Sequence, residues 1–215
     1  MPAIGITGGV GTGKSSFCNY LRELMPDAQF FDADKAARRL TDQDAEVKTE
    51  IGEVFGANIY SSSGDLNRGQ LRAIILESAA KRRALEQILH PRIRRQWSVE
   101  AQRHRNSPDF FLADIPLLYE TGGETLCDRV VVVACSPEVQ LARLVERRSS
   151  VKGLAGARPS INRSEAMELI NTQMPLEEKI RQADHVAWNN NGRAVLSAQA
   201  NDLVKLWRAK TWTQK

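Results

Sequence analysis

Short apolar runs alternate with longer stretches of helical periodicity along most of the chain. The run at Arg129–Cys135 is apolar without alternation, which is typical of a strand buried on both faces of a parallel sheet. Five runs predict β-strands: Ala3–Thr7, Gln29–Asp32, Phe110–Asp114, Arg129–Cys135 and His185–Trp188, the last with the weakest pattern. Strands that alternate with helices predict an α/β domain with a five-stranded, mainly parallel sheet.

Helix signals fill the segments between these runs. Ser136 followed by Pro137 is typical of a helix start, and Asn162 with Glu165 three residues later resembles a capping box. The predicted helices are Ser15–Leu24, Ser136 to about Arg148, Asn162 to about Gln173, and Arg193 to about Lys210.

One segment departs from this alternation. From about Lys35 to His104 the chain shows helical patterns and no convincing strand, and about 70 residues are too many for a simple crossover. We therefore predict a helical insertion that serves as a substrate lobe. Ser149–Pro159, rich in Gly, Ser and basic residues, is either a solvated loop or part of a mobile lid. The expected organisation is a core at 1–34, 106–142 and 176–215, an insertion at 35–105 and a lid at 143–175.

The strongest motif lies where the first predicted strand meets the first predicted helix. Residues 8–15 read GGVGTGKS and fit the phosphate-loop pattern G-x-x-x-x-G-K-[ST] without exception. The glycines allow successive backbone N–H groups to point at phosphate oxygens, and the following helix directs its positive end at the same anion. Lys14 can reach the β- and γ-phosphates, and the Ser15 hydroxyl can bind Mg²⁺. The motif predicts binding of a nucleoside triphosphate.

Three carboxylates lie at or just beyond the carboxyl ends of predicted strands, and these ends face the ligand crevice. Asp32 and Asp34 lie two residues apart, so in a continuing strand both would point the same way. At least one should then face the phosphate loop and orient an attacking hydroxyl; alternatively, Asp34 only caps a helix that starts at Lys35. Asp114 ends the third strand like a Walker B carboxylate, and it either holds Mg²⁺ through water or is simply a polar strand end.

Two further segments are candidates for ligand contacts. Pro116 ends the third strand, and Leu117 and Leu118 could line a substrate pocket. Arg143 and Arg147 are four residues apart in a predicted helix and share a face. Such arginines can neutralise charge on a transferring phosphoryl group, although a solvated basic face is the alternative.

Composition adds exclusions. With 215 residues, 42% hydrophobic and 26% charged, the chain is neither disordered nor collagen-like. The three cysteines lie far apart without a CxxC pair, so we expect small buried hydrophobes rather than disulfides or a zinc ribbon. The three histidines lack metal-ligand spacing, and Pro91 is expected to break or start a helix inside the insertion. The chain shows no signal-peptide pattern and no apolar run of membrane length, so we expect a soluble cytoplasmic protein.

The net charge of +4 is unevenly distributed. Lys81–Arg105 holds eight basic and two acidic residues, and Arg143–Arg163 holds six basic and one acidic. One basic segment lies in the predicted insertion and the other in the predicted lid. This distribution suits an enzyme that clamps two phosphate-bearing ligands, while a solvated face explains individual arginines equally well.

The class of nucleotide-binding protein can be narrowed further. No DxxG or NKxD motif occurs, which argues against a GTPase, and a helicase or motor normally needs a larger core. The four tryptophans are scattered and give no platform for stacking bases. A phosphate loop with a helical insertion and an Arg-rich later segment suggests a small-molecule kinase that closes over both substrates.

Several segments resemble the dephospho-coenzyme A kinase family, which catalyses the last step of coenzyme A synthesis. They follow the family's order over almost the whole chain: ITGGVGTGKSS at the start, DAD at 32–34, LHP at 89–91, IPLLYE at 115–120, the segment at 130–148, QMP at 173–175 and ADHVAWNNNG at 183–192. The resemblance implies a P-loop NTPase fold of the nucleoside-monophosphate-kinase type, with a nucleotide-binding core, a coenzyme-A-binding helical insertion and a lid. It also implies Mg²⁺-dependent transfer of the ATP γ-phosphoryl group to the ribose 3′-hydroxyl of dephospho-coenzyme A.

The resemblance further implies roles for single residues. Asp34 matches the acidic residue beside the acceptor hydroxyl, and Arg147 matches the lid arginine that approaches the phosphates. Asn189 and Asn190 match a segment near adenine. The expected ATP site is Gly9, Val10, Gly11, Thr12, Gly13, Lys14, Ser15, Ser16, Asn189 and Asn190. The expected catalytic residues are Lys14, Asp34 and Arg147; the metal ligands are Ser15 and Asp114; the substrate-binding residues are Thr7, Asp34, His90, Pro116, Leu117, Leu118 and Tyr119.

Two other functions stay open at this point. A kinase for a nucleoside, nucleotide or other metabolite would share the phosphate loop but not LHP and PLLYE. A nucleic-acid-binding ATPase or nucleotide-dependent switch would use the basic insertion. For the kinase we expect a small-molecule substrate, no nucleic-acid or membrane partner, and a monomer or weak homo-oligomer.

Overall fold

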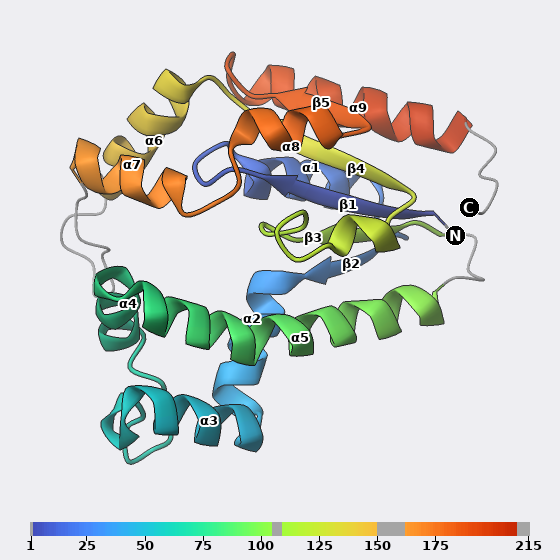
Figure 1. Ribbon diagram of the computed structural model, residues 1–215. Helices are drawn as coiled ribbons and strands as arrows, with labels where there is room; N and C mark the ends of the chain where they lie inside the picture. Colours follow the sequence, from blue (N-terminus) through green and yellow to red (C-terminus); the bar gives the residue numbers. More distant parts are fainter. Residues whose placement is uncertain (1, 105–108, 150–161, 210–215) are drawn as a thin grey trace. The chain divides into compact units, whose positions relative to one another are not determined.

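The computed structural model describes residues 2–104, 109–149 and 162–209, apart from the side chains of 147–149. The chain forms two compact units (Figure 1). The α/β unit comprises Met1–Phe31 and His104–Lys215, and the helical unit comprises Asp32–Arg103. The helical insertion was predicted over 35–105, and the irregular stretch Ser149–Pro159 lies, beyond its first residue, outside the described residues.

A five-stranded sheet in the order β2-β3-β1-β4-β5 organises the α/β unit. The strands are β1 Ala3–Gly8, β2 Gln29–Asp32, β3 Phe111–Asp114, β4 Arg129–Ala134 and β5 His185–Trp188. β1 runs parallel to both β3 and β4, and β4 runs parallel to β5. The sequence therefore predicted all five of these strands, and the α/β class with a parallel sheet is confirmed.

Helices of the α/β unit connect and cover the strands. They are α1 Lys14–Leu24, α6 Pro137–Ser149, α7 Arg163–Asn171, α8 Leu176–Gln182 and α9 Arg193–Ala209, with the short η2 at Gly123–Leu126. Helices α1 and α9 pack on each other, and their apolar faces join the inner strands in one buried core (Figure 1). Ile6, Val131 and Trp207 are among its fully or almost fully buried members. This core fixes the carboxyl end of β1, from which the phosphate loop starts.

Local sequence signals set the starts of two of these helices. The Ser136 Oγ accepts a hydrogen bond from the Val139 N–H at 3.4 Å, ahead of α6. Asn162 and Glu165 form the predicted capping box at the start of α7, with bonds of 2.9 and 2.8 Å. Both caps satisfy N–H groups that have no partner within the helix.

The helical unit contains α2 Ala33–Gln43, α3 Ala45–Phe55, η1 Ala57–Ile59, α4 Arg68–Glu77 and α5 Ala79–Arg103. Between η1 and α4 the chain makes an isolated antiparallel bridge, Tyr60 to Leu66. Side chains of Asp44 and Asn67 cap α3 and α4. A separate apolar cluster that includes the buried Val47, Ile51 and Ile59 holds these helices together. This unit therefore has its own core.

Helix α5 runs through Pro91, so the prediction that this proline breaks or starts a helix was wrong. A proline in a helix interior loses one backbone hydrogen bond and costs about 3 kcal/mol. Ile88 and Ile93, on either side of Pro91, both belong to the apolar cluster of the unit. A break between them would separate contacts on one continuous face, and their burial outweighs the local preference.

The end of β2 also differs from the expectation. The chain leaves the strand at Asp32, whose carboxylate caps α2 by accepting the Lys35 N–H at 3.0 Å. Asp34 lies inside the first turn of α2, so the alternative that Asp34 caps a helix starting at Lys35 was wrong. The two carboxylates therefore do not share one strand face.

Cys18 and Cys135 are buried and Cys127 is partly buried, all as free thiols. Burial raises the pKa of Cys127 to about 12, and burial with the nearby Asp114 charge raises the pKa of Cys18 above its ordinary range. These thiols are protonated at neutral pH and are therefore poor nucleophiles. None of the described helices has the length and apolar character needed to cross a membrane.

Candidate active site

The phosphate loop connects β1 to α1. Gly13, the residue just before α1, has a left-handed backbone with φ 96°, and a Cβ placed there would collide with the Asn189 Nδ2. Only glycine fits both restrictions. Gly13 has no side chain that could cap α1, so no capping side chain occupies the N–H groups at the amino end of this helix. Helix amino ends with such N–H groups bind anions.

Side chains from distant elements hold the loop backbone at Thr12. The buried Asn189 donates its Nδ2–H to the Thr12 carbonyl at 2.8 Å. Arg143 of α6 donates to the same carbonyl and to the Asn189 Oδ1, both at 3.4 Å. Thr12 itself donates its hydroxyl to the Gly9 carbonyl at 2.8 Å. These bonds fix the backbone of the loop before a ligand arrives.

Two glutamines hold the other side of the loop at Val10, and the sequence analysis missed both. The buried Gln140 of α6 donates its Nε2–H to the Val10 carbonyl at 2.7 Å. The Val10 N–H donates to the Gln173 Oε1 at 2.9 Å. Gln173 belongs to the QMP segment and Gln140 to the segment at 130–148, and membership of these two segments was the available signal.

Lys14 and Asp114 form an ion pair beneath the loop. Their side chains are only 12% and 10% exposed, so water screens the pair weakly. β3 places Asp114 opposite Ile6 of β1, which explains how the two motifs meet. Ser15 lies beside Lys14 in the first turn of α1. A hydroxyl and a carboxylate are oxygen donors of the kind that Mg²⁺ takes together with phosphates and waters, so Ser15 and Asp114 fit this ion.

The residues after β3 differ in their surroundings. Thr7 is buried and donates its hydroxyl to the Pro116 carbonyl at 3.0 Å, and Leu117 is partly buried. Leu118 is fully buried against the sheet at Gly5. Tyr119 is 8% exposed, and its hydroxyl has no hydrogen-bond partner among the described residues.

Burial and the charges of Asp184 and Glu124 raise the pKa of Tyr119 to about 12. Asp184 and Glu124 precede β5 and β4 in the chain, so they belong to the amino ends of these strands. The phosphate loop leaves from the carboxyl end of β1. Tyr119 therefore lies within electrostatic range of carboxylates that precede β4 and β5.

Other predicted site residues belong to different elements of the chain. Asp34 and His90 belong to the helical unit, on α2 and α5. Arg147 lies in the last turn of α6, and its side chain is outside the described part of the chain. The Asn190 Oδ1 accepts the Ser136 N–H at 2.8 Å, which joins the end of β5 to the start of α6.

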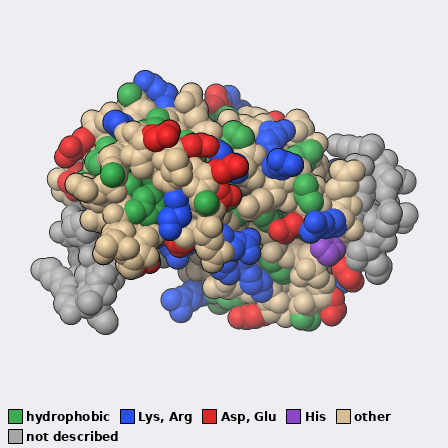
Figure 2. Space-filling view, turned by 90° about the horizontal axis from the view of Figure 1, so that it is seen from below, with side chains coloured by type: hydrophobic (Ala, Val, Ile, Leu, Met, Phe, Trp, Pro, Cys, Tyr) green, Lys and Arg blue, Asp and Glu red, His purple; other side chains and the backbone are tan. Residues whose placement is uncertain are grey.

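Charged side chains of both signs reach the molecular surface, and Lys and Arg form several groups there (Figure 2). Part of the basic set on α5 is used within the helical unit. Lys81 donates to the Val54 carbonyl, and Arg92 pairs with Glu50. Local structure therefore explains some of these basic residues, as the sequence analysis allowed.

The fold and the phosphate loop together define the protein as a P-loop NTPase of the small-molecule kinase type. A family model described as dephospho-CoA kinase matches residues 2–195. The dephospho-CoA kinase of Bacillus anthracis is 34% identical over 206 residues, which cover 95% of this chain and 96% of the relative. The chain belongs to the dephospho-CoA kinase family.

Solved structures agree with this assignment of the fold. A crystal structure of a Thermus thermophilus protein superposes with a TM-score of 0.73 at 27% identity, covering 98% of both chains. The dephospho-CoA kinase of Campylobacter jejuni gives a TM-score of 0.68 at 23% identity, covering 94% of this chain and 95% of that chain. The resemblance recognised from the sequence and the P-loop kinase fold are thus confirmed.

Proposed function

We propose that the chain transfers the ATP γ-phosphoryl group to the ribose 3′-hydroxyl of dephospho-CoA. The observation that carries this proposal is the family match over residues 2–195, because it includes both the phosphate loop and the helical unit. A phosphate loop alone is shared by many NTPases, whereas the helical unit is where a kinase family distinguishes its acceptor.

The ATP site is proposed to lie in the phosphate loop, with the Lys14 ammonium and the amino end of α1 against the phosphates. Phosphoryl transfer requires positioning and charge stabilisation rather than a covalent intermediate on the protein. The bonds to Thr12 and Val10 support this role because they fix the loop backbone before ATP binds. Lys14 exchanges the Asp114 carboxylate for phosphate oxygens as ATP enters.

Ser15 and Asp114 are proposed to hold Mg²⁺, Asp114 through a water. The ion would supply charge neutralisation at the phosphates. The shift of Lys14 toward the phosphates leaves the Asp114 carboxylate available for this role.

Asp34 is proposed to align the acceptor 3′-hydroxyl and to accept its proton at the end of transfer. Its place just after the carboxyl end of β2 supports this role, because ligands of open α/β sheets bind beyond the carboxyl ends of the strands. Arg147 is proposed to stabilise charge on the transferring group as residues 143–175 close as a lid.

The remaining expectations complete the proposal. His90, Leu117 and the helical unit bind dephospho-CoA, and the partner is this small molecule rather than nucleic acid. The enzyme works in the cytoplasm as a monomer or weak homo-oligomer, in keeping with its free thiols.

The test supplies the purified chain with ATP, Mg²⁺ and dephospho-CoA and follows coenzyme A by mass. Parallel reactions contain shikimate or a panel of nucleosides as acceptors. We expect coenzyme A to form and kcat/KM for the other acceptors to be at least about 100-fold lower. Equal or faster transfer to a nucleoside would replace the proposal with the metabolite-kinase alternative.

Asp34→Asn tests the assigned role of the carboxylate. The variant should lose about 100-fold in turnover while it binds ATP normally, since the carboxylate acts on the acceptor hydroxyl. Asp42→Asn, at the other end of α2, is the matched control and should keep normal turnover. Full turnover of Asp34→Asn would refute the role.

A further inference from the structure

Lys179 of α8 is the one lysine or arginine that is fully buried among the described residues, with its side chain 0% exposed. Lysines usually extend their ammonium group to water, because burying the charge costs several kcal/mol unless partners replace the water. A fully buried ammonium therefore calls for an account of its partners.

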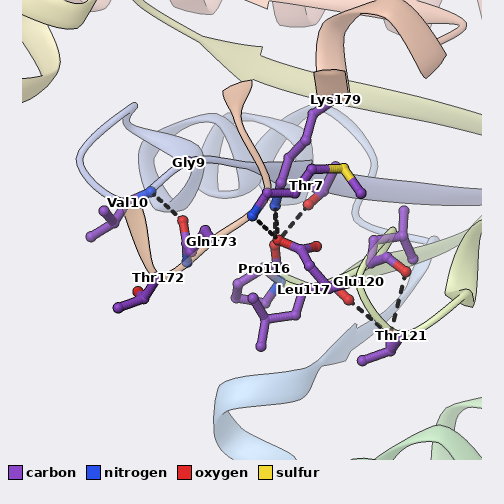
Figure 3. A network of polar contacts seen from close by, with 12 residues as sticks. Thr7, Gly9, Val10, Pro116, Leu117, Glu120, Thr121, Thr172, Gln173 and Lys179 are labelled. Carbon is purple, nitrogen blue, oxygen red and sulfur yellow. Dashed lines mark hydrogen bonds and ion pairs between the residues drawn. The ribbon is translucent and has the colours of Figure 1, made fainter. Parts of the chain in front are cut away.

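The ammonium has two partners, and both belong to the segment after β3 (Figure 3). Lys179 donates to the Pro116 carbonyl at 2.9 Å and to the Glu120 Oε1 at 2.8 Å. Thr7 donates its hydroxyl to the same Pro116 carbonyl. Lys179 thus ties α8 to the last residues of β1 and to the chain just beyond β3.

Glu120 extends this contact toward the phosphate loop. Its Oε1 accepts the Met174 N–H at 2.9 Å, besides the Lys179 ammonium. The neighbouring Gln173 accepts the Val10 N–H at 2.9 Å (Figure 3). A chain of contacts therefore runs from Lys179 through Glu120 to the Met174 N–H, along the backbone to Gln173, and from Gln173 to the loop backbone.

A second connection reaches the ion pair under the loop. Pro116 lies two residues after Asp114, the partner of Lys14. Lys179 therefore contacts the segments that set both the loop backbone and the Lys14 partner, although it touches neither the loop nor Lys14 directly through a hydrogen bond given by the structure.

Stability alone explains this arrangement poorly. Burial lowers the pKa of the Lys179 ammonium, whereas Glu120 opposes that change and the charge of Lys14 adds to it. A buried ion pair often contributes no more than an apolar pair of the same volume. What an apolar side chain cannot replace is the simultaneous orientation of a carbonyl and a carboxylate.

We propose that Lys179 is a positioning residue for phosphoryl transfer, which acts through Glu120 and the Pro116 carbonyl to hold the 172–174 turn and the phosphate loop in place. This inference rests on the proposed kinase function. It assigns a role to a buried side chain whose two partners given by the structure are the Pro116 carbonyl and Glu120.

The test compares Lys179→Met with Arg181→Met. Methionine keeps the length of the side chain but orients neither partner, and Arg181 lies on the same helix with its side chain 74% exposed. For Lys179→Met we expect KM for ATP to rise about tenfold and kcat to fall about tenfold, with KM for dephospho-CoA changed less than about twofold. Arg181→Met should match the unsubstituted enzyme.

The chain of contacts makes a second demand. Glu120→Gln keeps an acceptor oxygen for Met174 and should raise KM for ATP less than Lys179→Met does. In the double variant the two effects should not add, because both act through the same contacts. A folded Lys179→Met with unchanged KM for ATP and unchanged kcat, or full additivity in the double variant, would overturn the inference.

If Lys179→Met does not fold, Gln173→Ala carries the test at the far end of the chain of contacts. It should raise KM for ATP about fivefold at normal Tm, and an unchanged KM would reject the proposal. Calorimetric titration with an ATP analogue separates this outcome from failure of the proposed function. If the enzyme transfers no phosphate to dephospho-CoA, the proposed function fails, but Lys179→Met should still bind the ATP analogue more weakly than the unsubstituted chain. An unchanged affinity for the analogue would contradict the positioning role.

Discussion

The two compact units use their polar side chains differently. In the α/β unit, the buried Asn189 and Gln140 bond to backbone carbonyls of the phosphate loop from far along the chain. In the helical unit, Asp44 and Asn67 cap their own helices, and the ion pair of Arg68 with Asp42 is half exposed. Polar groups therefore hold the phosphate loop in the first unit, whereas in the second they cap helices and link neighbouring elements of that unit.

Because of this difference, substitutions that reduce function and substitutions that reduce stability should fall in different units. Buried long-range hydrogen bonds fix a conformation that the loop sequence alone cannot hold. The helical unit depends instead on apolar side chains, whose removal leaves a cavity. Substitutions at the loop contacts of the α/β unit should therefore change ATP binding or turnover. Substitutions of comparable size in the core of the helical unit should instead lower the free energy of unfolding.

The largest effect is expected from Lys14→Ala. Loss of the ammonium removes charge stabilisation at the phosphates, so turnover should fall about 1,000-fold and ATP binding should weaken. Titration with ATP and single-turnover rates measure the two losses. Lys205→Ala, an exposed lysine of α9, is the control. Retention of normal ATP affinity by Lys14→Ala would contradict its placement at the phosphates.

In the helical unit the corresponding change is Ile51→Ala. The side chain is fully buried in the cluster, so its truncation should lower the free energy of unfolding by about 3 kcal/mol. Denaturant titration measures this loss, and Ile51→Val should cost about 1 kcal/mol. At temperatures where the variant is folded, its KM for ATP should be unchanged. A changed KM would contradict the expectation that the helical unit affects stability and not ATP binding.

A smaller functional effect is expected from Asn189→Ala. The variant loses the bond to the Thr12 carbonyl, and KM for ATP should rise about tenfold with only a modest fall in Tm. Asn201→Ala on α9 is the matched control. Loss of stability without any change in KM would mean that Asn189 supports the fold and not the loop.

The smallest effect is expected from Tyr119→Phe. The phenol hydroxyl is buried without a partner among the described residues, so its removal should leave turnover and KM for dephospho-CoA unchanged. A raised KM for dephospho-CoA would support a substrate contact of the Tyr119 hydroxyl.

The same residue predicts a pH dependence. The pKa of Tyr119 is raised from 10.0 to about 12, so the folded state retains a proton that the unfolded chain releases. The free energy of unfolding should therefore fall as the pH rises from 10.0 to about 12. Denaturant titration over this window should show a smaller fall in Tyr119→Phe, and an identical slope would contradict the shift.

Signals that act over a few residues were read correctly from the sequence. The phosphate loop follows from residue spacing, the strand at Arg129–Ala134 from a continuous apolar run, and the capping box from Asn162 and Glu165. Each depends on neighbours in the chain.

Features that depend on tertiary contacts could not be predicted from neighbouring residues in the sequence. Pro91 should break a helix by local rules, yet the apolar cluster on both sides keeps α5 continuous. A lysine in a polar helix predicts exposure, whereas Lys179 meets Pro116 across 63 positions of sequence. Gln140 reaches Val10 across 130 positions, and nothing local marks it as a ligand-site residue.

The most direct test of the central claim is the position of the transferred phosphate. The product of a reaction with dephospho-CoA, ATP and Mg²⁺ is isolated, and phosphorus NMR locates the new phosphate while ADP is quantified. The proposed function predicts a single new phosphomonoester on the ribose 3′-oxygen, formed in equimolar amount with ADP. Release of ADP without a phosphorylated acceptor, or phosphate on another oxygen, would contradict it.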